Sequence, residues 1–142
     1  MTGHATPILF AGLVLLAGCS SGESSLALTE AINACSAEVD PQQNAPESGL
    51  DRATNEDLTR NAAAASARAD AAQRAADLDM RWASLAEAMD VISTAADAVL
   101  AAEAAGQSVV TALTPAEWDT VKEASNISIL ECEAARTQKE ST

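Results

Sequence analysis

Few residues of this chain carry an imidazole, thiol or phenol group, although Asp and Glu are abundant. Its single histidine is His4, its three cysteines are Cys19, Cys35 and Cys132, and it contains no tyrosine. Histidine is the commonest general base and metal ligand near neutral pH, and Cys–His or Ser–His–Asp arrangements cannot be built without it. The chemistry of the chain therefore depends first on whether His4 belongs to the folded protein, and on what the three thiols do.

His4 lies in a segment that has the features of an export signal. The first eighteen residues contain no Asp, Glu, Lys or Arg, and residues 8–17 form a nearly unbroken apolar run. Ten residues of helix span only about 15 Å, half of a bilayer's hydrocarbon core, so this run is too short for a transmembrane anchor. It ends in Leu16-Ala17-Gly18-Cys19, which resembles the lipobox of bacterial lipoprotein precursors.

This resemblance implies that residues 1–18 are removed as a signal peptide and that Cys19 becomes the lipid-bearing first residue. Two acyl chains hold a protein stably at a bilayer, so the lipid would anchor the chain on the exported side of the cell membrane or outer membrane. No cofactor beyond this covalent lipid is expected. Only His4 stands where the pattern has Lys or Arg, which would fit a true start a few residues upstream. The alternative to a lipoprotein is a non-lipidated secretory signal with a chance cysteine. Residues 19–25 are rich in Ser and predict a flexible tether.

Removal of residues 1–18 would leave a mature domain without histidine. Triads, classical zinc sites and di-iron bundle sites are then excluded, so we predict no catalytic residues, no metal ligands and no enzyme activity. The formal net charge stays at −13, because the removed segment holds none of the 8 basic or 21 acidic side chains. Such an acidic domain repels phosphate backbones, and we expect no nucleic-acid partner.

The other two cysteines, Cys35 and Cys132, would remain in an exported chain. An even number of cysteines in an oxidising compartment usually forms disulfides, so we predict a Cys35–Cys132 bridge, with two buried free thiols as the alternative. The residues around each cysteine fit the apolar face of a helix, which favours the bridge.

The fold class predicted for residues 26–138 is an all-α, alanine-rich antiparallel bundle of three to four helices. Alanine makes up about a quarter of the chain, and residues 50–105 contain neither Gly nor Pro. Helices are expected over residues 26–39, from about residue 50 to 106 with one break, and from 115 to about 138. Their start and stop signals are Thr54 or Ser48, Gly106 and Thr114-Pro115. Residues 139–142 are expected to be a disordered tail.

The break is predicted near residues 77–80, where two apolar stripes fall one residue out of phase. The first stripe consists of Leu58, Ala62, Ala65, Ala69, Ala72 and Ala76. The second consists of Leu78, Trp82, Leu85, Met89, Ile92, Ala96 and Val99. Either Asp77 or Asp79 could cap a new helix between them. The bridge requires this break as well, because one continuous rod of about 80 Å would hold the two cysteines too far apart.

The function predicted from these features is a membrane-anchored, non-catalytic interaction or structural domain with an envelope protein as its partner. The alternative is a lipoprotein that binds a cation or small ligand. Two features could serve the alternative, a pocket between the helices that carry Trp82 and Trp118, and an acidic helix face. The acidic face contains Glu87, Asp90, Thr94 and Asp97. Buried anchors and a solvated helix face explain the same residues and are the favoured interpretations.

Overall fold

The computed structural model describes residues 21–36 and 53–141, and these residues form a bundle of α-helices. Its elements are α1 (Ser21–Ser36), α3 (Asn55–Leu78), η2 (Met80–Trp82), α4 (Ala83–Ala104), η3 (Val109–Thr111) and α5 (Pro115–Glu140), where η marks a 3₁₀ helix. The described residues include no β-strand. The predicted all-α fold is therefore confirmed.

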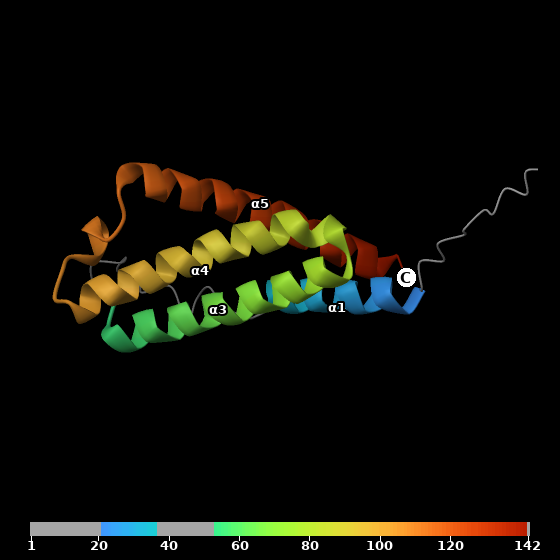
Figure 1. Cartoon of the computed structure of the whole chain (residues 1–142), viewed down its shortest axis with the longest axis horizontal. Coiled ribbons are helices and arrows are strands. Elements are labelled where there is room, and N and C mark those ends of the chain that lie inside the picture. The colour runs from blue at the N-terminus through green and yellow to red at the C-terminus, as the bar shows by residue number, and fades with distance from the viewer. Residues whose placement is uncertain (1–20, 37–52, 142) are drawn as a thin grey trace, which may run out of the picture.

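The α4 helix packs against both α3 and α5, and α1 packs against α3 and α5. Figure 1 shows α1 beside the C-terminal half of α3, so it accompanies only part of the bundle's length. The beginning of α1 and the end of α5 lie at one end of the bundle, and the α4–α5 connection lies at the other. The end that carries Ser21 is called the proximal end below, and the end that carries η3 is called the distal end.

The chain turns between α3 and α4 at Asp79, inside the predicted range of 77–80. Asp79 has an extended backbone, its N–H donates to the Ala75 carbonyl at 2.9 Å, and its carboxylate accepts from the Arg81 N–H at 3.0 Å. Asp79 thus ends one helix and caps the next, which satisfies free backbone groups on both sides of the turn. The predicted break is confirmed, although Leu78 is 38% exposed and the second apolar stripe effectively begins at Trp82.

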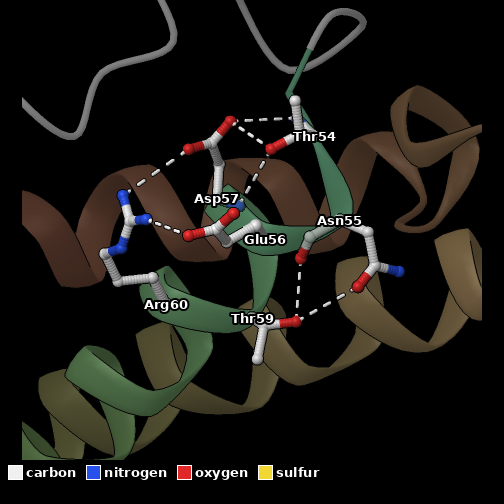
Figure 2. A network of polar contacts seen from close by, with 6 residues as sticks. All are labelled: Thr54, Asn55, Glu56, Asp57, Thr59 and Arg60. Carbon is white, nitrogen blue, oxygen red and sulfur yellow. Dashed lines mark hydrogen bonds and ion pairs between the residues drawn. The ribbon is translucent and has the colours of Figure 1, made fainter.

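The other helix ends follow their sequence signals. Gly106 has φ = +67°, and its N–H and that of Gln107 donate to the carbonyls of Glu103 and Ala102, a Schellman cap. Thr114 caps α5 in a capping box with Glu117. Figure 2 shows the corresponding capping box at α3. The Asp57 carboxylate accepts from the Thr54 backbone N–H, and the Thr54 hydroxyl oxygen accepts from the Asp57 backbone N–H.

The Thr54 cap gives a local test of this arrangement. We expect Thr54→Ala to lower the free energy of unfolding by about 1 kcal/mol, because the Asp57 N–H loses its acceptor. Thr59→Ala, one turn into the same helix, is the control, since the Thr59 hydroxyl bonds only to Asn55. Urea denaturation followed by circular dichroism measures both. Equal losses for the two variants would contradict a specific role of the cap.

The core is divided into two clusters along the bundle. The proximal cluster contains the largest fully buried side chains, Trp82, Leu85 and Met89, packed against alanines of α1 and α3. The distal cluster is centred on Leu58, Val99 and Val109, with Trp118 packed against it. Alanine methyl groups permit close approach of α1 and α3 but bury little area each, so the large residues of the proximal cluster supply most of the apolar burial.

Two helix boundaries differ from the predictions. The α1 helix begins at Ser21, so residues 21–25, predicted as a tether, belong to it. The α1 helix extends from the buried residues Ala27 and Leu28 back to Ser21. Glu23 lies in its first turn, where a negative charge interacts favourably with the helix dipole. The α5 helix continues to Glu140, where the Ser141 N–H donates to the Gln138 and Lys139 carbonyls. The predicted end of the first helix at residue 39 lies outside the described residues.

Candidate functional site

The predicted Cys35–Cys132 disulfide is present and joins α1 to α5. The sulfur atoms are 2.03 Å apart and the two Cα atoms 5.5 Å apart, and Cys132 is buried. Neither sulfur is therefore a free thiol that could attack a substrate or bind a metal. The bridge is a structural crosslink, and the neighbouring carboxylates of Glu131 and Glu133 belong to a helix surface beside it.

Two arginines of α3 hold α1 against the bundle, and the sequence alone revealed neither contact. The Arg68 Nε donates to the Ala34 carbonyl at 2.9 Å, near the C-terminal end of α1, where cations are favoured. Burial lowers the pKa of the Arg68 guanidinium, which nonetheless stays charged at neutral pH. Arg74 forms an ion pair with Glu30 at 3.0 Å. These contacts and the disulfide fix the position of α1 along α3.

The two tryptophans belong to different clusters and do not form a stacking pair. Trp82 is 1% exposed in the proximal cluster, and the Arg81 guanidinium lies over its ring, 4.1 Å from the ring centroid. Trp118 is half-buried in the distal cluster. Trp82 is thus a core anchor that has no face available to a ligand, and Trp118 is the indole that could meet one.

Trp118 borders a hollow of about 170 Å³ on one side of α5. The hollow is lined by Leu58 and Asn61 of α3, by Ile92, Ala95, Ala96 and Val99 of α4, and by Trp118 and Val121 of α5. Sites for drug-sized ligands usually measure about 300–1,000 Å³, so this hollow is small for a ligand site. It contains no charged lining residue to orient a ligand.

Two further hollows lie along the contact of α5 with α4. The first, of about 380 Å³, is lined by Asp90, Val91, Thr94, Ala95, Ala98, Leu113, Glu117, Thr120 and Val121. The second, of about 270 Å³, is lined by Ser84, Glu87, Ala88, Val91, Thr120, Glu123, Ala124 and Ile127. The two hollows adjoin at Val91 and Thr120, which line both of them, and together they are called the α4–α5 groove below.

Three of the four residues of the predicted acidic face line this groove. Glu87, Asp90 and Thr94 do so from α4, whereas Asp97 is exposed and lines neither hollow. The α5 side adds Glu117 and Glu123, whose position opposite α4 the sequence did not reveal. Within residues 21–36 and 53–141, no group of three or more His, Cys, Asp or Glu side chains is arranged to hold a metal ion.

Glu117 also has a local role. Its carboxylate accepts from the Thr114 backbone N–H at 2.6 Å and from the Thr114 hydroxyl at 2.7 Å, and these bonds lower the pKa of Glu117 in that order of importance. A carboxyl whose pKa is lower in the folded state stabilises the fold at neutral pH. That contribution is lost as the pH falls from the ordinary value of 4.5 through the lowered one.

Cys19 and the lipobox lie outside the described residues, so their predicted roles stay predictions. Among the helices that are described, none is long and apolar enough to span a membrane. Comparisons with other proteins place the chain in no family. No protein-family model, no curated protein and no solved structure is significantly similar to it.

Proposed function

We propose that the chain is a lipid-anchored, exported protein whose helical bundle binds another protein of the cell envelope and catalyses no reaction. The lipobox-like motif Leu16-Ala17-Gly18-Cys19 supports the anchor, and the lack of histidine after residue 18 supports a non-catalytic role. The envelope location would be the exported face of the cell membrane or outer membrane.

The observation that carries this proposal is the position of the bundle's ends. The first described residue, Ser21, follows Cys19 by two positions and lies at the proximal end, opposite the α4–α5 connection (Figure 1). A lipid on Cys19 would therefore hold the proximal end at the membrane and keep the distal end farthest from it. Residues of the distal half, including Thr94 and Thr120 at the α4–α5 groove, would then be accessible to a partner.

Binding of a cation or small ligand is the weaker candidate. The Trp118 hollow is small, and the carboxylates of the acidic face are exposed helix residues rather than a converging set of ligands. A protein partner of standard size needs a surface of about 800 Å² on each side, so it would contact more of α4 and α5 than the groove alone.

Site-specific photo-crosslinking in cells tests the proposed function. A photo-reactive amino acid replaces Thr94 on the α4–α5 groove, or Ser66 on an exposed position of α3 as the matched control. We expect one defined crosslinked protein from position 94 and none from position 66, because only the groove is proposed to contact the partner.

Cys19→Ala provides the second control for this experiment. We expect the variant to leave the membrane fraction, to lack lipid by mass spectrometry and to lose most of the crosslinked product. A Cys19→Ala protein that stays in the membrane fraction would refute the anchor. The absence of a defined product at position 94, or the same products at both positions, would refute the interaction role.

A further inference from the structure

The α4–α5 groove is long and has an apolar floor. It extends on α4 from Ser84 to Ala98, about 21 Å or four helical turns. Its floor consists of Val91, Ala95 and Ala98 of α4 and of Val121, Ala124 and Ile127 of α5, all buried or half-buried. The alanines make this floor flat enough for another helix to approach α4 and α5 closely.

The rims of the groove are acidic on both sides. Glu87 and Asp90 lie on the α4 rim, Glu117 and Glu123 lie on the α5 rim, and no Lys or Arg lines either hollow. Three basic side chains elsewhere in the described residues pair with acids, in Arg60–Glu56, Arg74–Glu30 and Lys122–Asp119.

The rim carboxylates differ from those pairs. Glu87, Asp90 and Glu123 are exposed and form no ion pair with any described residue. The groove therefore combines an apolar floor with negative rims that lack a counter-charge within the described part of the chain. Complementary charge is the usual means by which an interface selects its partner and its register.

We propose that the α4–α5 groove binds an amphipathic helix of a partner protein, with an apolar stripe on the floor and Lys or Arg residues on both flanks. Such a helix of about 14 residues matches the length of the groove. Its cations would pair with Glu87 and Asp90 on one flank and with Glu123 on the other. This inference rests on the proposed function, since it names the chemistry of the partner that the interaction domain binds.

The probe that tests the inference is a fluorescein-labelled synthetic peptide of about 18 residues, with leucines at helical i, i+3, i+4 spacing and lysines elsewhere. Fluorescence anisotropy measures its binding to the whole chain from residue 19 onward with Cys19→Ala. The same peptide with glutamates in place of the lysines serves as the reference and is expected not to bind.

Neutralising the rims tests the charges. The triple variant Glu87→Gln, Asp90→Asn and Glu123→Gln is expected to raise the dissociation constant about tenfold, because it removes three exposed ion pairs with the lysines, each of which is weak alone. The matched control neutralises three exposed acids away from the groove, by Asp70→Asn, Glu133→Gln and Glu140→Gln, and is expected to change affinity less than about twofold. Equal weakening by both would show binding by net charge alone and would overturn the inference.

Blocking the floor tests the groove itself. Thr120 is exposed and lines both hollows, so Thr120→Trp fills the groove without changing the charge. We expect Thr120→Trp to weaken binding at least as strongly as the triple variant, with helix content confirmed by circular dichroism. Unchanged affinity in this variant would overturn the inference.

The two proposals fail in different ways. If the lysine peptide does not bind while a defined protein crosslinks at position 94, the interaction role stands and the inferred partner chemistry is wrong. If the peptide binds as expected and cells yield no crosslinked protein, the groove chemistry stands and the proposed function is wrong.

Discussion

Replacing Cys35 and Cys132 together with alanine is expected to lower the free energy of unfolding by about 4–5 kcal/mol at 25 °C. The bridge closes a loop of 97 residues, and a crosslink of that length strongly restricts the unfolded chain. The loss is a large part of the 5–15 kcal/mol that holds a typical domain folded. In addition, α1 is short and its buried face is mostly alanine, so it has little else to hold it near α5.

Urea denaturation of the Cys19→Ala chain, with and without the two further substitutions, measures this effect. The Cys19→Ala background removes the third thiol, so that no alternative disulfide can form. A thiol reductant should destabilise the parent to a similar extent and leave the double variant unchanged. A double variant that unfolds at the same urea concentration as its parent would contradict a stabilising role of the bridge.

Trp82→Ala is expected to cost about 3–5 kcal/mol, the range for truncating a fully buried aromatic side chain. Trp82 is 1% exposed, directly precedes α4 and packs in the cluster that joins α1, α3, α4 and α5. Its removal also deprives the Arg81 guanidinium of the ring beneath it.

Trp118→Ala is the matched control, because Trp118 is half-buried at the edge of the smaller distal cluster. Thermal and urea unfolding of both variants compares the two clusters directly, and we expect Trp118→Ala to lose clearly less stability. If Trp118→Ala proves the more damaging substitution, the distal cluster and not the proximal one is the main source of stability.

Much of the fold could be predicted from the sequence because its determinants are local. Thr54 and Thr114 stand three residues before the carboxylates that complete their capping boxes, and Gly106 is the only residue near its position that accepts a positive φ readily. The break at Asp79 was visible as a one-residue shift between two apolar stripes. The Cys35–Cys132 disulfide could be predicted because both cysteines lie on apolar helix faces.

The buried faces of the alanine-rich helices could not be predicted with the same accuracy. Alanine occupies almost every face of α3 and α4, so periodicity does not distinguish a buried methyl group from an exposed one. Ala71 and Ala75 are buried although neither belongs to the predicted stripe, because α3 packs against α1 and α4 at once. For the same reason Ala88 and Ala95 are buried on the central helix, α4.

The candidate site depended on tertiary structure even more strongly. The sequence placed Glu87, Asp90 and Thr94 on one helix face, but only the alignment of α5 along α4 sets Glu117, Thr120 and Glu123 opposite them. The role of Arg68 was hidden for the same reason, since its acceptor is a backbone carbonyl 34 residues away in the chain. Such pairings are fixed by the packing of whole helices and have no signature in local spacing.

The position of the disulfide has a mechanical consequence for a protein held at one end. If Cys19 carries the proposed lipid and a partner pulls on the bundle, tension that enters through α1 passes across the bridge from Cys35 directly to Cys132 on α5. The 97-residue loop is thereby bypassed, and roughly 330 Å of chain cannot be drawn out while the bridge is intact. In a chain anchored in this way, the covalent bond between α1 and α5 would limit how far the distal end moves from the membrane under load.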